Sequence, residues 1–100
     1  MTLVALVTDL MDQSRIRAAL PDVTFTRDPA TVTGAAVVIV DLTRFGDRIA
    51  EVRALTPGRI VAFGSHVDAD ALAAARDAGA DAVLARSRFF ADPVAAVTAR

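Results

Sequence analysis

The stretch AAVVIVDLTRF, residues 35–45, contains an unbroken apolar run that ends in a carboxylate. Residues 35–40 are all alanine, valine or isoleucine, and Asp41 follows directly. A short continuous run of this kind is typical of a strand that is buried on both faces of a parallel sheet. An ionised carboxylate at the end of such a strand is costly unless a partner stabilises it. We therefore predict a central strand over 35–40 and a role for Asp41 beyond that of a first loop residue.

Apolar runs and helical patterns alternate along the rest of the chain. Strands are predicted over 3–7, 23–28, 35–40, 59–64 and 81–85, and helices over 13–20, about 45–55, 69–78 and from Pro93 onward. The segment 23–28 alternates apolar residues with threonine, as edge strands do. Only residues 29–34 separate the second and third strands, so the second helix is abbreviated. The alternation predicts one α/β domain, 1–100, with a five-stranded parallel sheet and helices on both faces.

Composition excludes several function classes. The net charge is −1, which gives no indication of a surface for nucleic acid or membrane. Cysteine is absent, which excludes thiol catalysis and cysteine zinc sites. All 11 basic residues are arginine, so lysine chemistry and a P-loop are excluded. The apolar start MTLVALVTDL has no basic leader, and no apolar run approaches the ~20 residues that span a bilayer. We expect a cytoplasmic protein.

Polar residues follow the predicted strands. Asp9 comes after the first strand, Asp41 after the third, Ser65 and His66 after the fourth, and Arg86 after the fifth. The carboxyl ends of parallel strands share one edge of the sheet, where ligands bind. Each of these residues is also common in loops and helix caps. Asp9 and Asp41 together favour a site, because two adjacent carboxylates repel each other or recruit a cation such as Mg²⁺.

Three stretches resemble the receiver domains of response regulators, the CheY-like family. They are AARDAGADAVLARSRF (74–89), VVIVDLT (37–43) and IVAFGSH (60–66). The resemblance implies a flavodoxin-like sheet in the order 2-1-3-4-5. It also implies phosphorylation of an aspartate by a histidine kinase partner, a bound Mg²⁺, and a conformational change that a downstream effector reads.

Carried over by position, the resemblance makes Asp41 the phospho-acceptor. It makes Asp9, Asp41 and the backbone carbonyl of Thr43 the metal ligands. Ser65 and Arg86 correspond to the residues that contact the phosphoryl group or act in the switch. Arg86 would either bind a phosphoryl oxygen or form an ion pair with Asp41.

The chain also departs from the family pattern. Thr8 replaces the first residue of the acidic pair, and the switch hydroxyl aligns best with Gly64, one place before Ser65. Arg86 replaces a lysine, and Ser87 replaces a proline. These departures predict weak Mg²⁺ binding and an atypical or pseudo-receiver that signals through protein contacts and is not an enzyme.

No effector domain is expected, so the output would be a protein partner or a homodimer. The family pairs through its fourth and fifth helices and the strand between them, which correspond to residues 69–100. Phe89 and Phe90 would anchor such an interface if either is exposed.

A second hypothesis is that Asp41 is phosphorylated with Mg²⁺ held by Asp9. A third is a small enzyme or ligand-binding module that uses Ser65, His66 and Asp41 on the same edge. The local sequence AFGSHV lacks the G-x-S-x-G pattern of a nucleophile elbow. The segment TDLMDQS after the first strand has no glycine to cradle a phosphate. The receiver-like hypothesis is therefore favoured.

Overall fold

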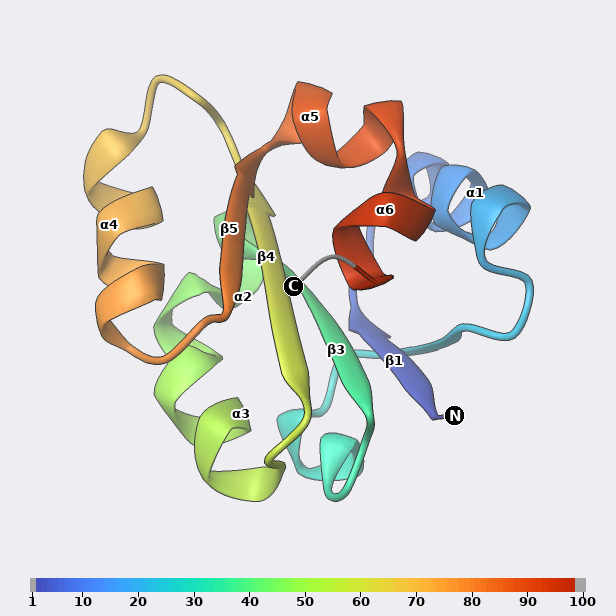
Figure 1. The fold of residues 1–100 in the computed structure, drawn as a ribbon, viewed down its shortest axis with the longest axis horizontal. Helices are drawn as coiled ribbons and strands as arrows, with labels where there is room; N and C mark the ends of the chain where they lie inside the picture. Colours follow the sequence, from blue (N-terminus) through green and yellow to red (C-terminus); the bar gives the residue numbers. More distant parts are fainter. Residues whose placement is uncertain (1, 99–100) are drawn as a thin grey trace.

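The computed structural model describes residues 2–98, so the outermost residues of the predicted domain 1–100 and interface 69–100 lie outside the described part. The sheet has five parallel strands in the order β2-β1-β3-β4-β5 (Figure 1). The strands are β1 (Leu3–Leu6), β2 (Thr24–Thr26), β3 (Val37–Asp41), β4 (Arg59–Gly64) and β5 (Ala82–Ala85). The predicted strands and their order are confirmed, with β3 shifted so that Asp41 is its last residue.

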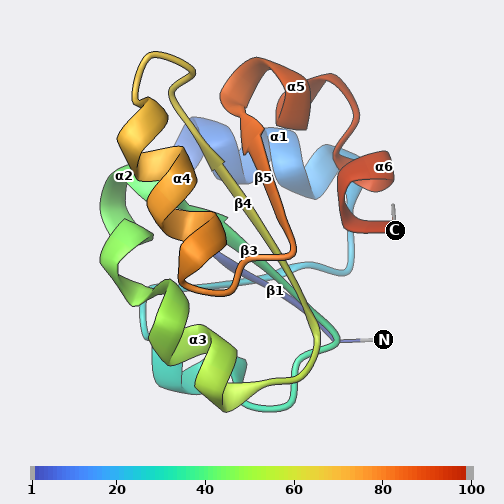
Figure 2. The ribbon, with the colours of Figure 1, turned by 60° about the vertical axis from the view of Figure 1, so that its left-hand side comes forward.

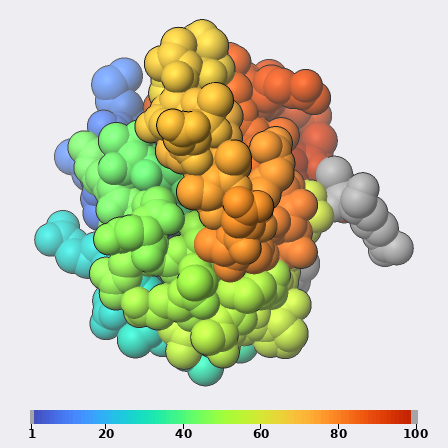
Figure 3. Space-filling view, turned by 90° about the vertical axis from the view of Figure 1, so that its left-hand side faces the viewer, coloured from blue at the N-terminus to red at the C-terminus, as the bar shows by residue number. Residues whose placement is uncertain are grey.

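Helices cover both faces of the sheet (Figures 1 and 2). One face carries α1 (Leu10–Ala19), α5 (Arg86–Ala91) and α6 (Pro93–Thr98). The other face carries α2 (Leu42–Phe45), α3 (Ile49–Leu55) and α4 (Ala69–Asp77), together with the 3-10 helices η1 (Pro29–Val32) and η2 (Gly46–Arg48). Figure 3 shows α3 and α4 side by side on this face. Within residues 2–98 no helix has the length and apolar character needed to cross a bilayer.

Two cores form because successive side chains of a strand point to opposite faces. Val38 and Val40 of β3 pack toward α3 and α4, whereas Val37 and Ile39 pack toward α1 and α6. All five residues of β3 are buried. The continuous apolar run at residues 35–40 therefore reflects a strand with a core on each side, as predicted.

Three helices differ from their predictions. The first begins at Leu10 and not at residue 13, because Asp9 acts as its N-cap. The helix predicted over about 45–55 is divided into α2, η2 and α3, with the division at Gly46, a poor helix former. Helix α5 was not predicted, because RSRFFA, 86–91, has no amphipathic repeat longer than one turn.

The predicted helix ends around α4 and α6 are confirmed. The Asp68 side chain accepts from the Ala71 amide at 3.1 Å, and the Asp92 side chain accepts from the Ala95 amide at 3.0 Å. Gly79 follows α4 with a φ of +118°, a conformation that favours glycine. The caps set where the helices start relative to the strands, and so position the loops at each edge of the sheet.

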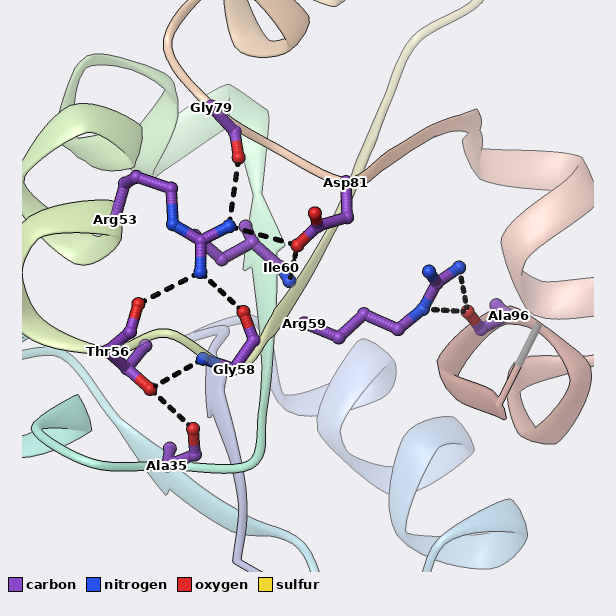
Figure 4. A network of polar contacts seen from close by, with 9 residues as sticks. All are labelled: Ala35, Arg53, Thr56, Gly58, Arg59, Ile60, Gly79, Asp81 and Ala96. Carbon is purple, nitrogen blue, oxygen red and sulfur yellow. Dashed lines mark hydrogen bonds and ion pairs between the residues drawn. The ribbon is translucent and has the colours of Figure 1, made fainter. Parts of the chain in front are cut away.

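At the amino-terminal edge of the sheet, Arg53 joins three separate segments (Figure 4). Its guanidinium donates to the backbone carbonyls of Thr56, Gly58 and Gly79, and to the Asp81 carboxylate at 3.0 Å. Asp81 also accepts from the Ile60 amide at 2.8 Å. Arginine suits this position because one planar group can donate several hydrogen bonds at fixed angles. The network ties α3 to the starts of β4 and β5.

Candidate functional site

Asp9, Asp41 and Arg86 lie together at the carboxyl edge of the sheet. β1 pairs with β3 in a register that sets Leu6 beside Val40, so the residues after these two positions emerge next to each other. Arg86 directly follows β5 at the same edge. Two further residues, Asp12 of α1 and Arg44 of α2, complete the group. We call these five residues the acidic rim.

Asp41 is buried and engaged within its own turn. Its Oδ1 accepts from the Thr43 amide at 3.0 Å, which caps α2, and its Oδ2 lies 3.5 Å from Nη1 of Arg44. The side chain is only 1% exposed, whereas that of Arg44 is 50% exposed. The guanidinium of Arg44 therefore lies on the solvent side of a carboxylate that has almost no access to water.

Asp9 is the N-cap of α1. Its Oδ1 accepts from the Asp12 amide at 3.0 Å. This hydrogen bond lowers the pKa of Asp9, and the positive charges of Arg44 and Arg86 lower it further. Asp9 is therefore ionised at neutral pH, and the positive charges of both arginines of the acidic rim stabilise its ionised form.

Arg86 forms its ion pair with Asp12. The two guanidinium nitrogens lie 2.7 and 3.1 Å from the two carboxylate oxygens, a bidentate geometry. The hydrogen bond with Asp12 raises the pKa of Arg86, and the charges of Asp41 and Asp9 contribute in the same direction. The alternative that Arg86 forms its ion pair with Asp41 is wrong, because Nη1 and Nη2 of Arg86 both donate to Asp12.

Asp12 was not among the predicted site residues. Its side chain is 6% exposed, so the carboxylate would be uncompensated without Arg86. The sequence signal was available in the spacing of Asp9 and Asp12. Two acids three positions apart at the start of a helix are favoured as N-cap and first-turn residues.

Ser65 and His66 do not join Asp41. The Ser65 hydroxyl accepts from the Val67 amide at 3.4 Å within its own turn, and His66 is exposed. The contacts of the described residues include no hydrogen bond from either side chain to Asp41. A Cβ atom at Gly64 would lie 3.3 Å from Leu42 Cβ and Cδ1, so Leu42 fills the space of a side chain there.

Comparison with known proteins gives matches at the level of structure. No protein-family model and no curated protein matches the chain. A response regulator from Burkholderia pseudomallei, described with a phosphorylated aspartic acid, calcium ion and citrate, superposes with a TM-score of 0.81 at 18% identity, over 98% of this chain and 66% of its own. The fold is that of a response-regulator receiver domain. This chain thus spans slightly less than two thirds of that protein.

Two further structures share the receiver fold. The phosphorylated cyanobacterial phytochrome response regulator RcpA superposes with a TM-score of 0.72 at 17% identity, covering 90% of this chain and 86% of its own. A CpaE2 pilus assembly protein from Sinorhizobium meliloti gives 0.64 at 14% identity, covering 91% and 95%. At identities this low, the superpositions establish the fold, and the function has to be argued from the residues of the site.

The acidic rim of this receiver fold does not offer the donor set of a divalent cation. Within residues 2–98 no three acidic or histidine side chains are grouped to hold a metal. Asp9 and Asp41 each give one oxygen to a backbone amide, and Asp12 is paired with Arg86. Thr43, the predicted carbonyl ligand, contacts Asp41 through its amide. The positive charges of the Arg44 and Arg86 guanidinium groups beside these carboxylates repel a divalent cation.

The aromatic residues after β5 belong to the interior. Phe89 is fully buried and stacks on Phe63, with ring centroids 4.8 Å apart. Phe90 is half-buried, and the Arg15 guanidinium lies 4.2 Å from its ring centroid. The prediction of Phe89 as an interface anchor is wrong, because α5 directs its apolar face toward β4. Phe90 keeps only partial access to solvent.

Proposed function

We propose that this chain is an atypical receiver-like signalling domain that acts through contacts with other proteins and does not use Asp41 as a phosphoryl acceptor. The observation that carries the proposal is the burial of the Asp41 carboxylate, which is 1% exposed beneath Arg44. Phosphoryl transfer requires an oxygen of the acceptor to reach the donor in line. Oδ1 of Asp41 accepts from the Thr43 amide, and Oδ2 lies beside the guanidinium of Arg44, so a phosphoryl donor would have to displace Arg44 to reach the buried carboxylate.

The surroundings of Asp41 support the same conclusion. A receiver that reads a phosphoryl group needs a hydrogen-bond donor that can move toward it. At the corresponding position this chain has Gly64, and the neighbouring space is filled by Leu42. Arg86, the other candidate donor, is held by two hydrogen bonds to Asp12.

The proposed partners are proteins, namely a kinase or a downstream effector, and a cytoplasmic location belongs to the same proposal. Response regulators among the structural neighbours support this class of partner. Association of two copies of this chain would be a second way to act through protein contacts. The net charge of −1 gives no indication of a surface for nucleic acid.

The absence of phosphorylation is testable by incubating the protein with Mg²⁺ and acetyl phosphate, followed by intact-mass spectrometry. We expect no phosphoryl adduct, because the Asp41 oxygens are engaged. An active receiver domain treated in parallel serves as the positive control. A phosphoryl adduct that is absent from Asp41→Asn would refute this part of the proposal.

Protein contacts are tested by light scattering over a range of concentrations, together with a pull-down on the immobilised chain. We expect either a concentration-dependent dimer or a reproducible protein partner. A chain that stays monomeric and captures no partner would contradict the proposed function.

A further inference from the structure

A hollow of about 380 Å³ opens at the carboxyl edge of the sheet, beside β2 and outside the acidic rim. β1 pairs with β2 in a register that sets Leu6 beside Thr26, so the residues after these two positions emerge next to each other. Open parallel sheets bind ligands at this edge. We call the hollow the β2 pocket, and its lining residues are Thr8, Leu10, Gln13, Phe25, Thr26 and Arg27.

One part of the β2 pocket is apolar. Leu10 and Gln13 are three positions apart in α1, so they lie on one face of the helix, and Leu10 is 78% exposed. Across from this helix, Phe25 of β2 is half-buried, and the Arg17 guanidinium lies 5.0 Å from its ring centroid. Leu10 and Phe25 therefore offer apolar surface to a bound molecule.

Three polar groups of the β2 pocket have no partner within residues 2–98. The Gln13 amide donates from Nε2 to the Val7 carbonyl at 2.8 Å, and its Oε1 accepts no hydrogen bond. The Thr8 hydroxyl makes no hydrogen bond, and the exposed Arg27 guanidinium makes neither a hydrogen bond nor an ion pair. Asp28, the acid next to Arg27, is engaged instead as the N-cap of η1. A cation, a hydroxyl and an acceptor oxygen are thus available to a ligand.

We propose that the β2 pocket binds a small organic carboxylate that carries an apolar body and a hydroxyl or amino group. Arg27 would pair with the carboxylate, since a planar guanidinium can donate two parallel hydrogen bonds to it. Oε1 of Gln13 would accept from the hydroxyl or amino group, and Leu10 and Phe25 would contact the apolar body. The volume of the pocket lies within the ~300–1,000 Å³ that small-molecule sites occupy. The proposal depends neither on Asp41 nor on a protein partner.

The charge of the β2 pocket favours a carboxylate over a phosphate. Among the residues that line the pocket, Arg27 alone is cationic. Its sequence neighbour Asp28 is acidic, and so is Asp9, which lies between Thr8 and Leu10 of the lining. Arg27 balances one negative charge, whereas the second charge of a phosphate dianion would meet the repulsion of these carboxylates. A monocarboxylate is therefore the ligand that fits.

The test is an NMR titration of the nitrogen-labelled chain with phenyllactate, which combines a carboxylate, a hydroxyl and a phenyl ring. We expect saturable shifts of the amide signals of Thr8, Gln13 and Arg27, with a dissociation constant in the millimolar range or tighter. Phenyllactamide, which carries no charge, should bind about tenfold more weakly or not at all, because the charge-assisted pair with Arg27 is lost. Inorganic phosphate at the same concentration should not compete.

Arg27→Gln should weaken phenyllactate binding about tenfold or more, and it should fold because Arg27 is exposed and makes no ion pair. The matched control is Arg48→Gln, which removes the same charge from the exposed pair with Glu51 and should leave binding unchanged.

Four results would overturn the proposal. They are no saturable shift with phenyllactate, equal affinity of the wild type and Arg27→Gln, binding of phenyllactamide as tight as that of phenyllactate, and competition by inorganic phosphate at equal affinity. A phosphoryl adduct on the wild type would instead refute the proposed function, because that assay is scored by mass and does not involve the β2 pocket. The two failures are therefore distinguishable.

Discussion

Gly58 lies in the turn before β4, where the chain passes very close to the backbone of residues 35 and 36. A Cβ atom there would lie 2.5 Å from the Ala36 carbonyl oxygen and closer still to that of Ala35. The obstacle is backbone, which cannot rotate away as a side chain can. At this position glycine is required by space and not by a positive φ.

At the residue scale we predict that Gly58→Ala lowers the free energy of unfolding by about 3 kcal/mol or more. Gly46→Ala is the matched control. Its Cβ would lie 3.9 Å from Leu42 Cβ, an ordinary contact, and Gly46 has helical angles. The control should be neutral or stabilising by up to about 1 kcal/mol. Circular dichroism melts are suitable because the chain has no tryptophan or tyrosine. Equal stability of the two variants would contradict the close approach at Gly58.

At the scale of elements, Arg53 and Asp81 hold the amino-terminal edge of the sheet. Burial raises the pKa of Asp81, but hydrogen bonds from the Ile60 amide and from Arg53 outweigh burial, and the pKa lies below its usual value of 3.8. A carboxylate with a depressed pKa in the folded state stabilises the protein at pH values above its unfolded pKa. That contribution is lost as the pH falls through the folded pKa.

We therefore predict that Asp81→Asn is less stable than the wild type by about 1 kcal/mol at pH 7, since a half-exposed ion pair and part of a hydrogen bond are lost. The difference should begin to shrink below about pH 4, where the unfolded-state carboxylate starts to bind a proton, and should be lost as the pH falls through the lower pKa of the folded state. Urea unfolding at several pH values measures it. A stability difference that stays constant down to pH 2 would show that the Asp81 charge makes no contribution.

At the scale of the whole molecule, the sheet separates two cores, and contacts between the helices over each core hold those helices in place. On the face of α1, α5 and α6, the pair of Asp12 and Arg86 joins residues that are 74 positions apart. Arg15 of α1 adds a cation–π contact with Phe90 of α5. These contacts link α5 to α1 across this face of the sheet.

The coupling is measurable by a double-mutant cycle. We predict that Asp12→Asn lowers the free energy of unfolding by about 2 kcal/mol, less than for a fully buried pair because Arg86 is 38% exposed. Asp12→Asn/Arg86→Gln should cost less than the sum of the two single variants. Additive effects would mean that the pair does not couple α1 to α5.

Much of this architecture was predictable from local patterns. The apolar runs at residues 35–40 and 59–64 predicted the buried strands, and Asp68, Asp92 and Gly79 predicted helix ends, all of which the structure confirms. Such signals depend on neighbours within a few residues, since side-chain alternation and capping are local. The location of Asp9, Asp41 and Arg86 at one edge followed from the parallel sheet alone.

The partners of those residues were decided by the tertiary structure. Asp12 and Arg86 meet only after α1 and α5 pack on the same face, and the burial of Phe89 depends on the same packing. The sequence by itself determined which elements form and which charged residues gather at the carboxyl edge. Only the fold decided that Arg86 pairs with Asp12, which lies 74 positions away. The reason is that ion pairs depend on angstrom-scale distances between distant segments, which no local pattern encodes.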